Sequence, residues 1–416
     1  MRPWIVWCTG LLAYIVAVLD RTTFGVSGLD AADRFGASSS VLSTFVVLQI
    51  IVYAATQIPA GVLLDRFGPK AMIATGLAII SAGQLTLGLT HSLPTAIGAY
   101  ALVGLGDAFI FISAIRLVPN WFAPPMVPLV TQLTGICGQL GQVLSAVPFL
   151  ALLLHHGWTV AYAAAAALGV LSIVFTLALV RDTPHGTEVV AEPRTVHSTV
   201  ADIKAVWSRP GTRLGFFTHM GTQFAMTVFA LMWGLPYLTK AQGLTPSVAG
   251  GLLTVSVATF AVAGVAIGIF SGRHPHARPA LVLGLIVASA TIWTVVLALP
   301  HRAPGWLLVL LVVVIAVSQT VSLVAFDFAR TYNPRTSLGT AQGMVNTGGF
   351  IASLLVMQAM GIIIGGVYSF DSFRAAWTVQ YVVWAVAAVG VARSGRKARH
   401  SERLGEPGAL TVSPGH

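Results

Sequence analysis

The chain has 416 residues, of which 56% are hydrophobic and only 9% are charged, and its formal net charge is +10 at pH 7. A water-soluble protein of this length needs many more charged residues to cover its surface. The composition therefore excludes a soluble globular protein and predicts a protein that is solvated by lipid. We attribute the excess of basic residues to the orientation of the chain in the membrane and to contact with anionic lipid head groups. We therefore expect no nucleic-acid partner.

Twelve apolar stretches are long enough to span a membrane as helices, since each span needs roughly 20 apolar residues. They predict an all-α membrane protein with twelve transmembrane helices in two six-helix bundles. The stretches lie near residues 5–26, 41–62, 71–90, 95–118, 127–153, 158–180, 215–238, 247–271, 279–299, 305–328, 341–366 and 373–393.

The polar segments divide the chain into four parts. We predict an N-terminal bundle over 1–181, a cytoplasmic linker over 182–212, a C-terminal bundle over 213–393 and a tail over 394–416 that is disordered because it is rich in Gly, Pro, Ser and charge. Within the linker, 199–207 alternates polar and apolar residues like a short amphipathic helix. Most of the 23 basic residues fall on the cytoplasmic side if both termini are cytoplasmic, which favours that orientation in a plasma membrane, the bacterial inner membrane.

A short charged loop separates the second and third predicted spans. It reads Gly61-Val-Leu-Leu-Asp65-Arg66-Phe67-Gly68-Pro69-Lys70, and part of it returns as Gly268 and Arg273, with Gly272 in the place of the acid. The first copy resembles the cytoplasmic loop signature of the major facilitator superfamily, G-x-x-x-D-R/K-x-G-R/K-R/K, at all but the ninth position. The resemblance implies the major facilitator fold and transport of small solutes. We therefore predict a gating loop made of Gly61, Asp65, Arg66, Gly68, Lys70 and Arg273.

Three charged residues that lie away from the ends of the predicted spans are the candidates for function: Asp20 and Arg21 in the first span and Asp107 in the fourth. An ionisable side chain at mid-bilayer costs roughly 2.5–3.5 kcal/mol on insertion scales unless it meets a partner or water, so these positions indicate function. Other interpretations remain open. Asp107 is compatible with an interhelical hydrogen bond, and Asp20 and Arg21 with snorkelling toward the interface.

Leu19-Asp20-Arg21 in the first span and the acid that follows Gly106 in the fourth resemble the anion:cation symporter branch of the superfamily, which carries organic anions and sugar acids. The resemblance implies that Asp20 and Asp107 are proton sites and that Arg21 binds the substrate anion. One position departs from the branch: Tyr100 stands where a second arginine is usual. We therefore expect Asp107 to lack that counter-ion and Tyr100 to offer a hydroxyl to the substrate.

Uncharged polar residues in the second half extend the candidate site. His219 in the seventh span and Gln319 in the tenth are predicted to contact substrate, although polar residues in membranes more often tie helices together. Asp327 and Arg330, three residues apart, favour a local ion pair that acts as a gate or clasp.

Proton-coupled symport of an organic anion is the function that these residues favour. The alternative is a proton-coupled drug or metabolite efflux antiporter, but the antiporter signature of the fifth span needs Gly-Pro where this chain has Gly138-Gln139. We expect no enzyme, because no catalytic Ser-His pair or phosphate-binding loop stands out. Cys8 and Cys137 lie within spans, so we also expect no metal site and no cofactor. A small anionic solute, protons and the lipid bilayer are the expected partners of a monomer.

Overall fold

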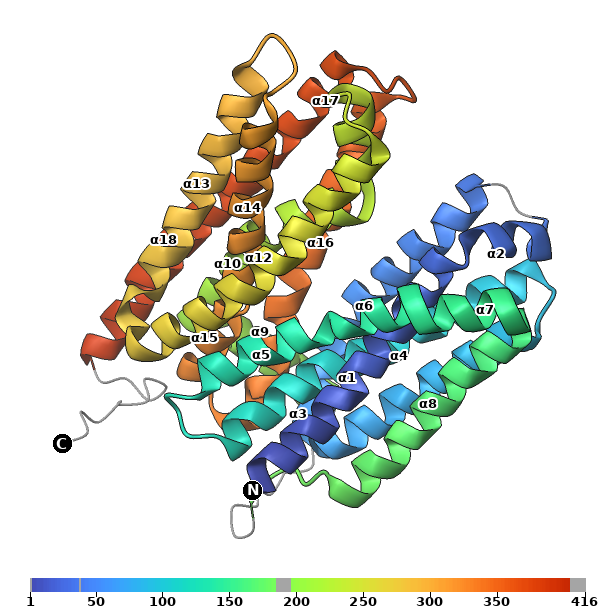
Figure 1. Cartoon of the computed structure of the whole chain (residues 1–416). Helices are drawn as coiled ribbons and strands as arrows, with labels where there is room; N and C mark the ends of the chain where they lie inside the picture. Colours follow the sequence, from blue (N-terminus) through green and yellow to red (C-terminus); the bar gives the residue numbers. More distant parts are fainter. Residues whose placement is uncertain (1, 37–38, 185–195, 405–416) are drawn as a thin grey trace. The chain divides into compact units, whose positions relative to one another are not determined.

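Helices connected by short turns make up almost all of the described chain (Figure 1). The computed structural model describes residues 2–36, 39–184 and 196–404. Within these residues, 10 helices are long and apolar enough to cross a membrane. One of them, Val47–Leu89, contains both the second and the third predicted spans, and the predicted seventh span is present but interrupted by π-helical turns. The all-α membrane fold predicted from the apolar stretches is confirmed.

Two compact units form the chain. Unit 1 contains Met1–Thr199 and Thr336–Gly343, and unit 2 contains Val200–Arg335 and Met344–His416. The first part of one late helix therefore belongs to unit 1. The prediction of bundles at 1–181 and 213–393 stays a prediction, and these units show that the compact groups do not follow chain order strictly.

The helices of unit 1 include one long element with a break. They are α1 (Arg2–Val26), α2 (Gly28–Phe35), α3 (Ser39–Leu89), α4 (Leu93–Trp121), α5 (Val127–Gly138), α6 (Leu140–Leu144), α7 (Leu150–His156) and α8 (Trp158–Leu179), with a π-helical turn at Ser145–Phe149. The break in α3 is at Gly68, whose φ of 77° and ψ of 164° are not helical. Glycine reaches that φ without strain, and the following Pro69 suits the first turn of the next helix.

α9 (Val196–Ser208) contains the segment predicted as an amphipathic helix and leads into unit 2. The helices of unit 2 are α10 (Pro210–Val228), α11 (Gly234–Pro236), α12 (Pro246–Arg273), α13 (Arg278–Ala298), α14 (Gly305–Val321), α15 (Val324–Tyr332), α16 (Leu338–Ile364, its first turns in unit 1), α17 (Phe370–Ala376) and α18 (Gln380–Leu404). Short 3₁₀ turns lie at Pro275–Ala277, Arg335–Ser337 and Trp377–Val379, and π-helical turns at Phe229–Trp233 and Tyr237–Ala241. α18 continues into the segment predicted as a disordered tail, and the rest of that segment, 405–416, lies outside the described residues.

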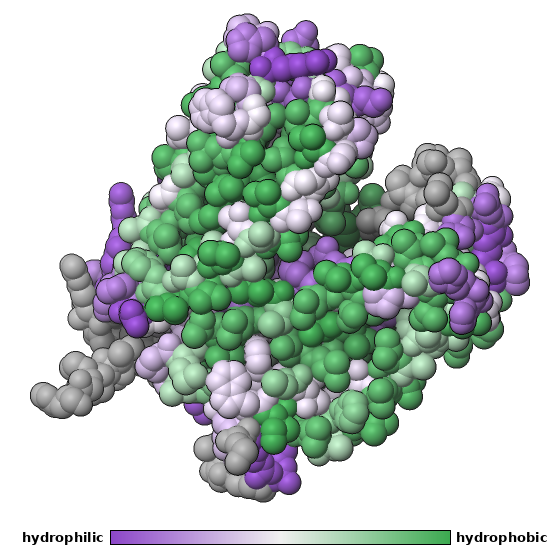
Figure 2. Space-filling model, viewed as in Figure 1, coloured by the Kyte–Doolittle hydropathy of each residue, from purple (hydrophilic) through white to green (hydrophobic). Residues whose placement is uncertain are grey.

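Large apolar side chains are exposed on the sides of both units, as Figure 2 shows by its broad green surfaces. Val262 is 75% exposed, Ile362 72% and Leu154 66%. Patches of this extent are not tolerated by a soluble monomer, but they match the hydrocarbon of a bilayer. The hydrophobic cores of the units lie inside, and unit 2 buries Trp293 and Trp377 in a stacked pair whose ring centroids are 4.4 Å apart.

Candidate functional site

An ion pair inside unit 1 connects two of the membrane-embedded charges. Arg21 of α1 and Asp107 of α4 approach to 3.3 Å between Nη1 and Oδ2, and the side chain of Asp107 is fully buried while that of Arg21 is 23% exposed. Asp107 therefore has a counter-ion, and the expectation that it lacks one because Tyr100 replaces an arginine was incomplete. The positive charge comes from α1, which packs along α4.

Asp20, the third charge, is fully buried. Neither of its carboxylate oxygens has a hydrogen-bond partner in the described part of the chain. The amide of Gln84 on α3 is beside it, but its Nε2 donates to the backbone carbonyl of Asp20, at 2.8 Å. Because adjacent helix positions point about 100° apart, α1 presents Asp20 and Arg21 to different neighbours.

Tyr100 holds the backbone of α1 beside these charges. Its hydroxyl donates to the carbonyl of Arg21 over 2.5 Å, and its ring is fully buried near Phe24 and Phe45. Those two phenylalanine rings stack with centroids 4.2 Å apart. Tyr100 thus lies beside Arg21, and its hydroxyl is engaged by the backbone of α1; its contact with substrate stays a prediction.

Several participants were not identified from the sequence. Gln84 and Thr23 contact Asp20, and the hydroxyl of Tyr14 contacts Arg21. The signals for them are weak: Gln84 is a lone amide in an apolar span, and Tyr14 lies seven residues, about two helical turns, before Arg21. Such residues are usually structural in membrane helices. Only the packing of α1 against α3 identifies Gln84, whereas Thr23 and Tyr14 contact charged residues of their own helix.

The polar residues predicted in unit 2 make interhelical contacts. Nδ1 of His219 on α10 accepts a hydrogen bond from the backbone N–H of Gly349 on α16 at 3.2 Å, and Gln223 accepts one from Ser353 at 3.3 Å. A side chain at Gly349 would collide with both acceptors. These bonds tie α10 to α16, and they fix His219 as a neutral imidazole whose proton is on Nε2. Gln319 lies half-buried on α14.

The predicted gating loop contacts the first turn of α16 within unit 1. Asp65 Oδ1 accepts a hydrogen bond from the Gly339 N–H at 2.7 Å, and Asp65 Oδ2 accepts from both the N–H and the hydroxyl of Thr340, each at 2.8 Å. A side chain at Gly61 would overlap the Gly339 backbone, so glycine is required at both surfaces. A carboxylate here accepts hydrogen bonds from N–H groups that have no partner within the helix, and its negative charge is stabilised by the positive end of the helix dipole.

The other charged residues of that loop face different partners. The Arg66 guanidinium lies over the Phe67 ring at 5.2 Å, and the Lys70 N–H donates to Asp182 Oδ1 at 2.6 Å. Asp182 thus caps the helix that follows Gly68. Burial raises the pKa of the Asp182 carboxyl, and the Lys70 N–H opposes this rise. Asp182 is the first residue of the predicted linker, and its carbonyl also accepts a hydrogen bond from Asn120 at 3.0 Å, so this part of the linker is packed on unit 1.

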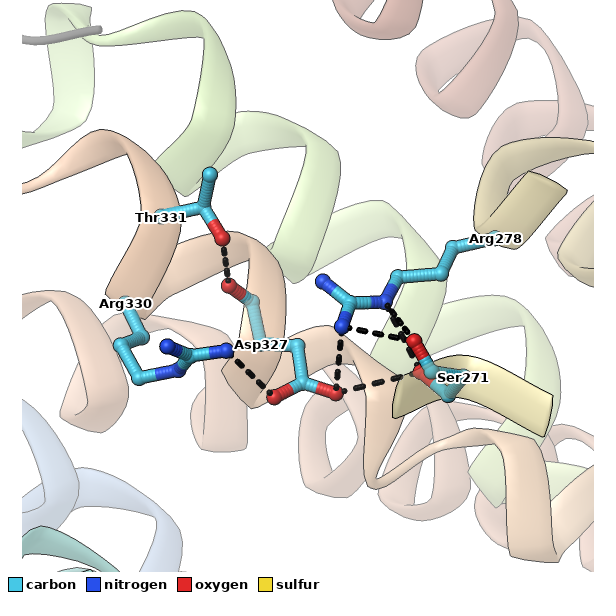
Figure 3. A network of polar contacts seen from close by, with 5 residues as sticks. All are labelled: Ser271, Arg278, Asp327, Arg330 and Thr331. Carbon is cyan, nitrogen blue, oxygen red and sulfur yellow. Dashed lines mark hydrogen bonds and ion pairs between the residues drawn. The ribbon is translucent and has the colours of Figure 1, made fainter. Parts of the chain in front are cut away.

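In unit 2 the partial repeat of the loop has lost its acid, and Asp327 of α15 provides a carboxylate there (Figure 3). Asp327 lies 3.4 Å from Arg330, as predicted, and also 3.8 Å from Arg278. Ser271, near the end of α12, donates to Asp327 and accepts from Arg278. The C-terminal end of α12, which ends at Arg273, is thereby attached to α13 and α15 by a mostly buried polar network.

A helical membrane protein with buried, paired and unpaired charges inside its spans is of the class that moves solutes across bilayers. Residues 10–233 match the model of the Major Facilitator Superfamily, and the chain belongs to this family. The structure is similar to that of the transporter FucP in the outward conformation, with a TM-score of 0.68, 14% identity, and coverage of 95% of this chain and 99% of that one.

Two curated relatives are named as sugar-acid transporters. Over 408 residues, 89% of this chain and 88% of the relative, the chain is 22% identical to the "Probable galactarate/D-glucarate transporter GudP" of Escherichia coli (strain K12). Over 173 residues, 42% of this chain, it is 23% identical to the "Probable L-galactonate transporter" of the same organism. That second match spans only 38% of the relative's length.

Proposed function

We propose that the chain is a secondary transporter of the plasma membrane that carries a small organic anion together with protons by alternating access. The observation that carries the proposal is the separation of charges in unit 1: Arg21 pairs with Asp107, while the buried Asp20 has no partner for its carboxylate. A guanidinium held by one carboxylate suits exchange of that carboxylate for a substrate anion.

Asp20 provides the proton site of the proposed mechanism. An ionised carboxylate without hydrogen bonds is strongly disfavoured when buried, so Asp20 is stable there as the neutral acid. Asp107 becomes available to a second proton when substrate takes its place on Arg21. Proton binding and anion binding then favour each other, which is the requirement for symport.

Sugar acids are the proposed class of substrate. The two relatives named above support this choice, and a guanidinium matches a carboxylate in a bidentate manner. Tyr100 is proposed to accept a hydrogen bond from a sugar-acid hydroxyl, because its own proton is donated to the Arg21 carbonyl, and His219 and Gln319 stay proposed substrate contacts. The Nε2–H of His219 is the available donor, since its Nδ1 is engaged by Gly349.

The gating loop has a proposed role in the conformational cycle, with both termini cytoplasmic. Asp65 binds the first turn of α16 through three hydrogen bonds, and we assign to this contact the clasp that holds one state and opens in the other. On the same grounds, Gly61, Gly68 and Lys70 shape the loop, while Arg66 and Arg273 face the anionic lipid surface.

Uptake of radiolabelled D-glucarate into proteoliposomes under an imposed pH gradient, acid outside, tests the proposal. Accumulation above equilibrium is expected for the wild type. Asp20→Asn should abolish dependence on the gradient, and Arg21→Ala should abolish uptake. Asp371→Asn, a substitution of an exposed acid in the first turn of α17, serves as the control and should retain uptake.

Two results would contradict this proposal. Gradient-driven accumulation that persists in Asp20→Asn removes the proton role from this residue. Efflux of lipophilic cations, with no anion among D-glucarate, galactarate and L-galactonate accumulated, would instead establish the antiporter alternative.

A further inference from the structure

A row of buried polar groups leads from Asp20 to the end of α1. Asp20, Thr23 and Ser27 are spaced three and four residues apart, so they share one face of the helix. All three are completely buried, as are Gln84 on α3 and Tyr162 on α8, which face them. A continuous polar row of this kind is costly in a membrane protein, and it indicates a function.

Hydrogen bonds join these groups into a chain. The Thr23 hydroxyl donates to the Asp20 carbonyl at 2.8 Å and accepts from Gln84 Nε2 at 3.2 Å. The Tyr162 hydroxyl lies 2.7 Å from the Ser27 hydroxyl and also interacts with that of Thr23. Either oxygen of the Tyr162–Ser27 pair is able to donate, so the direction of that bond can reverse.

Ser27 occupies a position where its hydroxyl would ordinarily serve the helix. It is the residue before α2, and serine there usually accepts a hydrogen bond from the first turn. Here the side chain makes no such bond, and its hydroxyl pairs with Tyr162 instead. The local preference of the sequence is therefore overridden in favour of the polar chain.

At the Asp20 end, buried acceptors outnumber donors. Neither carboxylate oxygen of Asp20 nor Oε1 of Gln84 has a partner at hydrogen-bond geometry, and the neighbouring Gln84 amide donates to the backbone of Asp20. A proton on Asp20 would supply the missing donor. At the other end, Arg34 of α2 donates to the carbonyls of Thr90 and Gly88, at 3.0 and 3.3 Å, and acts electrostatically on Tyr162.

We propose that Tyr162, with the hydroxyls of Ser27 and Thr23, forms the path by which protons reach Asp20 from the membrane face where α2 lies. This inference rests on the proton role proposed for Asp20. In each transfer, one hydroxyl accepts a proton and releases its own to the next, so the net result is one proton moved from the aqueous face beside α2, through the buried hydroxyls, to the Asp20 carboxylate. In the last step the Thr23 hydroxyl turns from the backbone carbonyl of Asp20 to its carboxylate.

The charged groups around the path are compatible with this role. Asp107 on α4 faces Asp20, and its negative charge attracts the arriving proton. Asp30 and Arg34 of α2 face Tyr162 with opposite charges, and the neutral Tyr100 of α4 is also close to it. Arg34 keeps α2 attached to the end of α3 through its bonds to the carbonyls of Gly88 and Thr90.

Infrared measurement of hydrogen–deuterium exchange at Asp20 tests the path without a substrate. The carboxylic-acid carbonyl band of the reconstituted protein, identified as the band missing in Asp20→Asn, shifts when the proton is replaced by deuterium. We expect Tyr162→Phe to slow this shift by about a hundredfold, the lower end of what a positioned proton-transfer group contributes. Thr23→Val and Ser27→Ala should slow it too.

Tyr237→Phe is the matched control, because Tyr237 is also a buried tyrosine whose hydroxyl is hydrogen-bonded, to Gln242 at 2.8 Å, but it lies in unit 2. It should leave the exchange unchanged. Unaltered exchange in Tyr162→Phe, Thr23→Val and Ser27→Ala, or a band that does not exchange in the wild type, overturns the path alone. Absence of any band that depends on Asp20 overturns the path together with the proton role of Asp20.

Discussion

Replacing Asp65 by Asn should release the first turn of α16 from the gating loop. The carboxylate accepts three hydrogen bonds there, one through Oδ1 and two through Oδ2. Asparagine keeps one oxygen, which can still accept from Gly339, but its amide nitrogen then faces the two donors of Thr340. Two hydrogen bonds to a charged acceptor are lost, together with the negative charge at a helix N-terminus.

The magnitude follows from these losses. A hydrogen bond to a charged group contributes about 1.5–3 kcal/mol, and a charge at a helix terminus about 0.3–1 kcal/mol. Asp65 is half-buried, so the lower ends apply, and the expected loss is about 3 kcal/mol. Local opening of this turn should then become roughly a hundredfold more frequent, since each 1.4 kcal/mol is a factor of ten.

Amide hydrogen exchange with mass-spectrometric detection measures that opening directly. Peptides that contain Gly339 and Thr340 should exchange about a hundredfold faster in Asp65→Asn. The matched control is Asp182→Asn, which removes the other carboxylate cap of unit 1 and should instead accelerate exchange at Lys70. If Asp65→Asn leaves exchange at Gly339 and Thr340 unchanged, the contact does not stabilise this turn and the clasp must be abandoned.

Three further substitutions have defined outcomes. Gly349→Ala places a methyl group against His219 and should lower the free energy of unfolding by about 1–3 kcal/mol, which is measured as a lower thermal midpoint. An unchanged midpoint would show that the contact between α10 and α16 adjusts to the methyl group without cost. Asp327→Asn leaves Arg278 and Arg330 without this counter-ion and should lower the free energy of unfolding by about 3 kcal/mol, again measured from the thermal midpoint. An unchanged midpoint would show that the network does not stabilise the fold. Burial raises the pKa of Asp182 above its ordinary value of 3.8, so the native state binds this proton more tightly than the unfolded state does. The thermal midpoint of the wild type, relative to that of Asp182→Asn, should therefore fall as the pH rises from 3.8 through the raised pKa. A difference between the two midpoints that does not change with pH would contradict the pKa shift.

The sequence by itself determined the membrane fold, because twelve apolar stretches and scarce charges have no stable alternative in water. It also indicated a candidate site, since Asp20, Arg21 and Asp107 are charged residues that lie away from the ends of apolar spans. The charged loop could also be predicted from the sequence, because its glycines and charged residues lie close together in the chain.

Only the tertiary structure decided which charge pairs with which. Arg21 neighbours Asp20 in the sequence but contacts Asp107, 86 residues away, because helical rotation separates adjacent side chains and packing joins distant ones. For the same reason the partners of Asp65 lie 274 and 275 residues along the chain, and the hydroxyl of Tyr162 meets Ser27 across 135 residues. Periodicity in a sequence specifies which face of a helix is polar, but the neighbour of that face is set by how the helices pack.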